Sequence, residues 1–525
     1  MSRSQRFLPA IAAACAAALF LASCGSGESG NVASAAGADA GDPVAGGVLR
    51  AIQMGEPRSL DPAALSNTWA HQPVLGNALY GTLMINNLDT LEVEYKMASD
   101  FSTTDGGATF DLVLRPGLTF TDGTPLDAAA VKFNWDRLRD PALGSTAIRQ
   151  AAQVASSEVV DPTTLRITLA SPNPHFPQGM LTTSMNWIAS PAALQKGPAE
   201  FDRTPVGAGP FTLKNWMRGD AVELVKNPQY WDAPKPYLDE LTVRTVPDNS
   251  QRFNMISTGG ADLSLEASWG TLAEADAAGI PTEVVPAGGG QIMIMNTARA
   301  PFDDVRARRA VSLATDLDAL NSVVFNGEGE TPETLFPEGS PYFADIPLWK
   351  GDKETAQKLF DELAAEGKPV SFTFMSYPTQ ETKAAAESLQ AQLAAFRNVN
   401  VEVQVVDYAA ATARAGARDF DMVISSAITQ DPDYALWTAF HGDSPGNFSG
   451  LDDAELNDAL DAGRIAQTVE ERRAAYETAQ NRLVDLVPGV WYTKAAPSVM
   501  YGENVHGVRM FTLGSPMPEE MWMTN

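Results

Sequence analysis

Residues 110–141 read FDLVLRPGLTFTDGTPLDAAAVKFNWDRLRDP, and this stretch predicts a strand, a turn and a helix in succession. Phe110, Leu112 and Leu114 occupy every second position at its start, which is the period of a half-buried β-strand. Asp122-Gly123 marks a tight turn. A helix is expected to begin after Asp127 and to end before Pro141. Its apolar stripe at helical spacing comprises Val131, Trp135 and Leu138.

Two further helices are predicted from a cap followed by an apolar stripe. Asp303 or Asp304 caps the first, and its stripe comprises Leu313, Leu317, Leu320 and Val324. The capping box TVEE at 468–471 begins the second, which ends before Pro488. Its stripe comprises Tyr476, Ala479, Leu483 and Leu486. Because short strand-like runs alternate with such helices from Gly47 onward, the sequence predicts a mixed α/β fold.

The first 23 residues predict a secretory signal peptide. Arg3 and Arg6 precede an apolar run at 7–21, which is shorter than a transmembrane helix requires. The sequence LASC at 21–24 resembles a bacterial lipobox, which implies cleavage before Cys24 and attachment of lipid to its thiol. The alternative is an ordinary signal peptide followed by a cysteine by chance. Residues 24–45 are rich in Gly, Ala and Ser and are expected to form a flexible tether.

Composition excludes several classes of function. The chain has 525 residues, which suffice for two to four domains. Lys and Arg number 37 against 65 Asp and Glu, a net charge of −28 without any basic block, so a nucleic-acid-binding role is excluded. The two cysteines, Cys15 and Cys24, are both N-terminal. The processed protein is therefore expected to lack disulfides, thiol catalysis and cysteine-based metal sites.

The sequence does not indicate an enzyme, a cofactor or a metal site. Residues 442–446 (GDSPG) match the G-x-S-x-G pattern but have loop-like sequence on both sides, whereas a nucleophile elbow needs a strand before it and a helix after it. A serine hydrolase using Ser444 and His441 remains the alternative from another class. The histidines show no metal-binding spacing. They are His71, His175, His441 and His506.

Nine short stretches carry a family resemblance through their order and distances. They are GGVL (46–49), EPRSLDP (56–62), LYGTL (79–83), LRPG (114–117), FTDGTP (120–125), PVGAGPF (205–211), KNPQYW (226–231), PFDDVR (301–306) and DPDY (431–434). Together they resemble the bacterial extracellular solute-binding proteins of family 5, the peptide/nickel class that serves ABC importers. The residue types in these stretches indicate turns and close packing in the fold, and they do not indicate which ligand is bound.

The resemblance implies a two-lobed periplasmic-binding-protein-like fold (type II, cluster C), α/β in class, with an extra domain inserted in the first lobe. Lobe I is expected to comprise 46–80, 189–290 and 489–525, the inserted domain 81–188, and lobe II 291–488. Two segments join the lobes, which close over a ligand. The resemblance further implies a monomer, lipid-anchored at the outer face of the cytoplasmic membrane, that delivers its solute to an ABC permease and its ATPase.

The expected solute is a peptide or a peptide-like compound. Peptide-binding relatives place an acidic residue shortly before the Asp-Pro element to pair with the peptide α-ammonium. This chain has Ile428 or Gln430 there, according to the direction of counting, so a free-amine peptide would need Asp431 or Asp433 instead. A sugar-like solute, a metal chelate and a membrane-tethered sensor remain the alternatives.

Position in the implied fold gives the candidate ligand-binding residues. Asn67, Thr68 and Trp69 follow the first strand, and Glu266 and Trp269 follow a later strand of lobe I. Lobe II is expected to contribute Tyr377, Asp431, Tyr434 and Asn447. Aromatic faces together with amide groups suit an extended, partly apolar ligand. Trp69→Ala and Asp431→Asn are accordingly expected to weaken binding and to leave the melting temperature of the ligand-free protein nearly unchanged.

Overall fold

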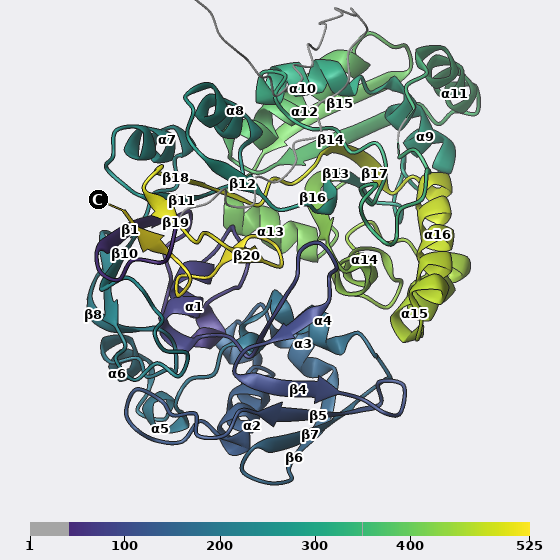
Figure 1. The fold of residues 1–525 in the computed structure, drawn as a ribbon. Helices are drawn as coiled ribbons and strands as arrows, with labels where there is room; N and C mark the ends of the chain where they lie inside the picture. The colour runs from purple at the N-terminus through teal and green to yellow at the C-terminus, as the bar shows by residue number, and fades with distance from the viewer. Residues whose placement is uncertain (1–40, 349, 525) are drawn as a thin grey trace, which may run out of the picture. The chain divides into compact units, whose positions relative to one another are not determined.

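The computed structural model describes residues 41–348 and 350–524. The predicted signal peptide, Cys24 and the tether up to residue 40 lie outside the described residues. None of the helices within the described residues combines the length and the apolar character that a membrane span requires. The described strands form three larger sheets that occupy separate regions of the ribbon (Figure 1).

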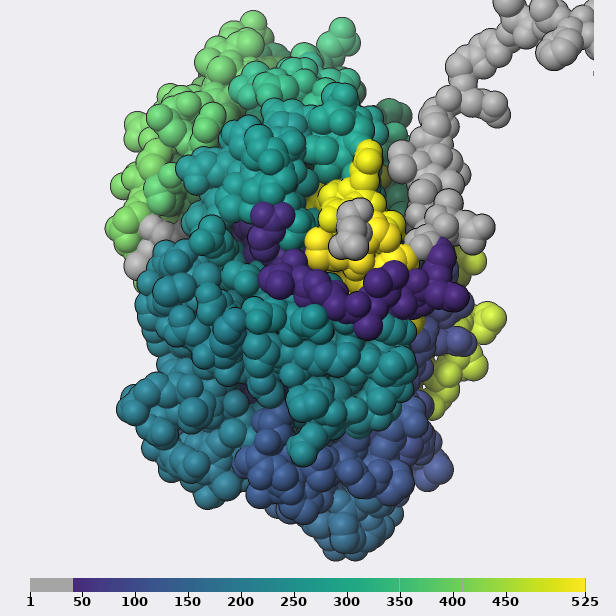
Figure 2. Space-filling view, turned by 60° about the vertical axis from the view of Figure 1, so that its left-hand side comes forward, coloured from purple at the N-terminus to yellow at the C-terminus, as the bar shows by residue number. Residues whose placement is uncertain are grey.

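A seven-stranded mixed sheet brings together segments from the beginning, middle and end of the chain. Its first strand, β1, runs parallel to β10 and β11, with Val48 opposite Glu240. The beginning of the described chain (purple) and its C-terminal segment (yellow) lie side by side on one face (Figure 2). The strands, in spatial order, are β12 (Thr282–Val284), β18 (Ser498–Tyr501), β11 (Leu263–Glu266), β1 (Val48–Gln53), β10 (Glu240–Thr245), β9 (Ala221–Lys226) and β8 (Phe211–Met217).

A buried helix, α1 (Pro73–Tyr80), packs beside this sheet, and two glycines allow the chain to pass close to its C-terminal end. A Cβ atom on Gly207 would lie 2.1 Å from the Leu79 carbonyl oxygen, and one on Gly209 would lie 2.3 Å from that of Ala78. The backbone of the PVGAGPF stretch (205–211) therefore packs directly against the backbone of α1. Four other helices belong to this part: α5 (Pro191–Leu194), α6 (Pro198–Arg203), α7 (Asn249–Ser257) and α8 (Trp269–Ala277).

A five-stranded sheet is connected to the seven-stranded sheet by two segments of the chain. Its strands, in spatial order, are β15 (Val399–Val405), β14 (Val370–Ser376), β16 (Met422–Thr429), β13 (Gly288–Met295) and β17 (Gly489–Thr493). β13 pairs antiparallel with both β16 and β17. Because β17 belongs to this sheet, the domain boundary expected at residue 489 falls too early, and the chain rejoins the seven-stranded sheet only at Ser498.

The two connections between these sheets run side by side. Val285 N donates to the Pro497 carbonyl oxygen at 2.8 Å, just before β13 begins. β13 opens with three glycines, and a Cβ atom on Gly289 or Gly290 would lie within 2.0–2.1 Å of a carbonyl oxygen of β16 or β17. Both glycines have positive φ, which favours the absence of a side chain. The crossing is therefore built from closely packed backbone.

Helices surround the five-stranded sheet. The single helix predicted after Asp304 is in fact two helices, because Thr315 has extended backbone and Asp316 caps a new helix by accepting from Ala319 N. The capping box at 468–471 is confirmed. The helices are α9 (Val305–Ala314), α10 (Leu317–Phe325), α11 (Lys353–Ala365), α12 (Gln380–Leu393), α13 (Tyr408–Gly416), α14 (Pro432–Phe440), α15 (Ala454–Ile465) and α16 (Val469–Leu486).

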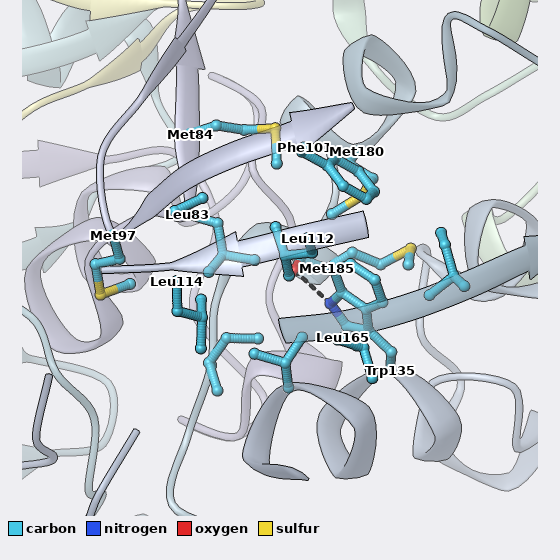
Figure 3. Close-up of a cluster of buried hydrophobic side chains, with 14 of the residues drawn as sticks. Leu83, Met84, Met97, Phe101, Leu112, Leu114, Trp135, Leu165, Met180 and Met185 are labelled. Carbon is cyan, nitrogen blue, oxygen red and sulfur yellow. Dashed lines mark hydrogen bonds between the residues drawn. The ribbon is translucent and has the colours of Figure 1, made fainter. Parts of the chain in front are cut away.

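The stretch at residues 110–141 belongs to a four-stranded antiparallel sheet with its own core. In spatial order its strands are β4 (Ala98–Ser102), β5 (Thr109–Leu114), β7 (Thr164–Leu169) and β6 (Val154–Val159). The predicted helix is confirmed as α2 (Ala128–Arg137), capped by Asp127. Its Trp135 is 3% exposed and donates from Nε1 to the Met185 carbonyl oxygen at 2.8 Å (Figure 3). The nearby helices are α3 (Ile148–Ala152) and α4 (Phe176–Leu181).

The remaining short elements complete the fold. They are strands β2 (Met84–Asn86), β3 (Val93–Tyr95), β19 (Val505–His506), β20 (Met510–Phe511), β21 (Ser515–Pro516) and β22 (Trp522–Met523), and 3-10 helices at Pro62–Ala64, Pro141–Leu143 and Ser184–Asn186.

Candidate ligand-binding site

A cavity of about 790 Å³ lies where the three regions meet, and we call it the cleft. This volume is within the range that small-molecule sites occupy. One wall comes from the segment after β1 and from the C-terminal loop, including Ser66, Thr68, Trp69, His71, Thr512 and Leu513. A second comes from around α3 and α4, including Thr146, Arg149, Gln178 and Thr182. The third comes from the five-stranded sheet and its helices, including Tyr377, residues 424–431, Tyr434, Thr438 and Phe448.

The edge of strand β16 faces the cleft. β13 pairs with all eight residues of β16, from Met422 to Thr429. On the opposite edge, the described part of the chain pairs through β14 with only Met422 and Val423. The next six residues, 424–429, all line the cleft. Their outward N–H and C=O groups are therefore available to an extended ligand, as at any free strand edge.

Two polar side-chain atoms in the cleft wall have no hydrogen-bond partner among the described residues. They are Trp69 Nε1, which is a donor, and Gln178 Oε1, which is an acceptor, and both atoms are buried. Leaving such a buried atom unsatisfied costs roughly 1–3 kcal/mol. Neither atom is accessible from the cleft, so these two groups are a cost within the fold and do not offer a contact to a ligand.

The acidic side chains around the cleft are neutralised by arginines. Asp431 lines the cleft, but its carboxylate accepts two hydrogen bonds from Arg472, at 2.5 and 2.8 Å. Burial acts to raise the pKa of Asp431, yet the charge and hydrogen bonds of Arg472 outweigh it, so this pKa lies below its ordinary value. Asp433 accepts from Arg464 at 2.8 Å and from Asn173 at 2.9 Å. Neither carboxylate is therefore free to pair with a ligand ammonium.

Arg149, on α3, contributes the opposite charge to the cleft. Within the described residues its guanidinium makes no ion pair and no hydrogen bond. It reaches the wall formed by the 442–447 loop, since a Cβ atom on Gly446 would lie 2.5 Å from Nη1. Burial raises the pKa of the neighbouring Tyr434, and the positive charge of Arg149 partly offsets that rise. The cleft thus holds one uncompensated cation.

The structure brings five of the nine predicted ligand-binding residues together in the cleft wall: Thr68, Trp69, Tyr377, Asp431 and Tyr434. Thr68 Oγ1 also lies 3.0 Å from His71 Nδ1. The residues that sequence reasoning missed are Arg149, Gln178 and the strand edge at 424–429. No local motif marks them, because their role depends on which segments fold against one another.

The other four predicted residues lie outside the cleft wall and support the fold. Asn67 donates to the Leu181 carbonyl oxygen at 2.7 Å, and Asn447 donates to that of Leu451 at 2.7 Å. Glu266 accepts from the buried Arg252 at 2.6 Å. Trp269 Nε1 donates to the Lys494 carbonyl oxygen at 3.0 Å.

The described residues do not place a catalytic or metal-binding constellation in the cleft. Ser444 follows helix α14 and a turn, so the strand–turn–helix context of a nucleophile elbow is missing. Its hydroxyl donates to the Thr438 carbonyl oxygen at 2.7 Å. No group of three or more His, Cys, Asp or Glu side chains within the described part of the chain is arranged to hold a metal ion.

Comparison with known proteins gives one family and several similar chains. Residues 92–447 match the family model described as bacterial extracellular solute-binding proteins, family 5 Middle. The chain is similar to the glutathione-binding protein GsiB of Escherichia coli K12, with 32% identity over 317 residues. That match covers 60% of this chain and 61% of the relative, which is less than two thirds of the relative's length.

Two solved structures show the fold. One is the PBP AgaA of A. tumefaciens R10 in complex with agropinic acid, with a TM-score of 0.77 and 24% sequence identity. The aligned region covers 91% of this chain and 99% of the AgaA chain. The periplasmic binding protein DppA of Helicobacter pylori, in complex with the peptide STSA, has the same TM-score and identity, with coverage of 91% and 98%. The predicted two-lobed α/β fold is thereby confirmed, whereas the inserted domain stays a prediction.

Proposed function

Because this chain belongs to the bacterial extracellular solute-binding proteins of family 5, we propose that it captures a peptide-like solute in the cleft and delivers it to an ABC importer. Binding and release are its task, and no bond is made or broken. In this proposal the cleft separates lobe I (46–80, 189–290 and the chain after Thr493) from lobe II (291–493), and residues 81–188 form the inserted domain. One chain holds a complete cleft and acts as a monomer.

The observation that carries this proposal is the unpaired edge of β16. An extended peptide presents the same alternation of N–H and C=O groups as a strand, so it fits a free strand edge without depending on its side chains. The six residues at 424–429 provide room for a peptide of a few residues.

Peptide capture is tested by titrating the full-length protein with a panel of tripeptides that includes reduced glutathione. We expect at least one member to bind with a micromolar or lower Kd. Each amide of that peptide is then N-methylated in turn, and the isomers serve as controls for one another. Only amides that face β16 should matter, and methylating one of them should weaken binding about tenfold or more, since it leaves a buried carbonyl unpaired.

Two outcomes would contradict this expectation. Binding of a sugar or a metal chelate, with no tripeptide bound, would move the solute to another class. Equal affinity for all N-methylated isomers would show that the peptide backbone does not pair with β16.

We propose further that Cys24 carries the lipid that holds the protein at the outer face of the cytoplasmic membrane. The support is the LASC sequence at 21–24 and the tether that follows it. Two or more acyl chains give stable anchoring. In cells that produce the full chain, Cys24→Ala should move the protein from the detergent phase of a Triton X-114 extract to the aqueous phase. Cys15→Ala is the matched control, and an unchanged partition of Cys24→Ala would refute the anchor.

A further inference from the structure

The charges around the cleft leave one side chain without a counter-ion. Among the described residues that line the cleft, only Arg149 and Asp431 carry a full charge at neutral pH, since burial lowers the pKa of His71 and keeps it neutral. Asp431 accepts two hydrogen bonds from Arg472, so its negative charge is neutralised within the protein. Arg149 has no such partner among the described residues.

Arg149 is an exposed residue on the cleft wall, and its guanidinium lies close to the opposite wall. Acidic residues outnumber basic ones by 65 to 37, so carboxylates are abundant as partners. The neighbours of Arg149 across the cleft are instead neutral: the backbone at Gly446, the side chain of Thr438 and the phenol of Tyr434. A guanidinium in such surroundings provides donors in a planar fork that matches a carboxylate.

From this placement we infer that Arg149 binds the C-terminal carboxylate of the ligand, and that the cleft selects peptides with a free carboxyl terminus without requiring a free α-ammonium. The inference rests on the proposed peptide capture. The ammonium requirement is absent because Asp431, the one acidic group among the described residues that line the cleft, is already paired. A peptide with a blocked amino terminus therefore loses nothing in this site, whereas a peptide with a blocked carboxyl terminus leaves Arg149 unpaired.

The test uses one equimolar tripeptide library prepared in four forms: unmodified, N-acetylated, C-terminally amidated, and blocked at both ends. The full-length protein is incubated with each library, and retained peptides are measured by mass spectrometry. We expect the unmodified and N-acetylated forms to be retained alike. Both amidated forms should be retained about tenfold less or lower still, because they lack the charge-assisted hydrogen bonds to Arg149.

Three variants locate the effect. Arg149→Gln should remove the preference for free carboxyl termini, and Arg149→Lys should keep part of it. Gly446→Ala, on the opposite wall, should reduce the preference although Arg149 is intact, because its Cβ atom would occupy the position of Nη1. Arg166→Gln is the matched control, since Arg166 pairs with Asp111 at an exposed position. The melting temperature of each variant shows that it is folded.

The outcomes separate this inference from the function on which it rests. Equal retention of all four forms would leave peptide capture standing and overturn the role of Arg149. Loss of the N-acetylated forms would show that an ammonium is recognised, which also overturns it. Retention of none of the forms would refute peptide capture itself, and the carboxylate site with it.

Discussion

Replacing Arg472 by methionine is expected to lower the free energy of unfolding by about 3–5 kcal/mol, because it leaves the Asp431 charge inside the protein without a counter-ion. The Arg472 side chain is 3% exposed and contacts Asp431 at 2.5 Å. It also donates to the Tyr342 hydroxyl at 2.6 Å. Methionine fills a similar volume but leaves the Asp431 carboxylate without a cation. Urea unfolding of the ligand-free, full-length protein measures the loss.

A double-mutant cycle supplies the control. Asp431→Asn alone should also destabilise strongly, and Asp431→Asn combined with Arg472→Met should cost less than the two single changes added together. Since folding lowers the pKa of Asp431, the stabilisation is present at neutral pH and is lost as the pH falls below the ordinary carboxyl value. A loss below about 1 kcal/mol, together with abolished binding, would instead support the ligand-binding role that the sequence predicted for Asp431.

Replacing Trp135 by alanine is expected to cost about 3–5 kcal/mol, because it removes the largest side chain from the core of the four-stranded sheet. Trp135 is 3% exposed, and its ring centroid lies 6.1 Å from that of Phe101. The variant also removes the hydrogen bond to Met185 that Figure 3 shows. Thermal and urea unfolding of the full-length protein measure the change.

The control is Trp216→Ala in the seven-stranded sheet. Trp216 is half-buried, packs against the edge of that sheet's core and lies under the Arg218 guanidinium, 3.7 Å from the ring centroid, so its loss should cost less than that of the fully buried Trp135. Ligand binding provides a second measurement, because α3 and α4 carry Arg149 and Gln178 and pack against the same core. If Trp135→Ala leaves ligand binding unchanged, this core does not support the cleft wall.

Features set by neighbours in the chain were predictable from the sequence. The helices after Asp127 and Thr468 were predicted because a cap and its stripe lie within a few residues of each other. The helix after Asp304 was predicted as one element because the apolar stripe continues across Thr315, although the backbone there is extended. Stripe periodicity records which residues are buried, and it does not record a change in helix direction.

Features of the cleft depend on contacts between distant segments, and these were only partly predictable. Arg149 looks like any other exposed cation in the sequence, and its role appears only when the loop at Gly446 folds against it. Conversely, Asn447 and Glu266 have the polar groups of a binding residue, but the fold uses those groups internally. The residue type shows that a hydrogen bond will be made, and the tertiary structure decides with what.

The paired crossing of β13 and β17 has a mechanical consequence. Two strands joined by hydrogen bonds resist sliding along each other and twisting about each other. They bend more easily in the direction perpendicular to the plane of the pair. The glycines at the start of β13 keep this strip thin. We therefore expect the lobes to move against each other mainly by rotation about this strip, so that a bound solute changes how far they rotate more than the direction in which they move.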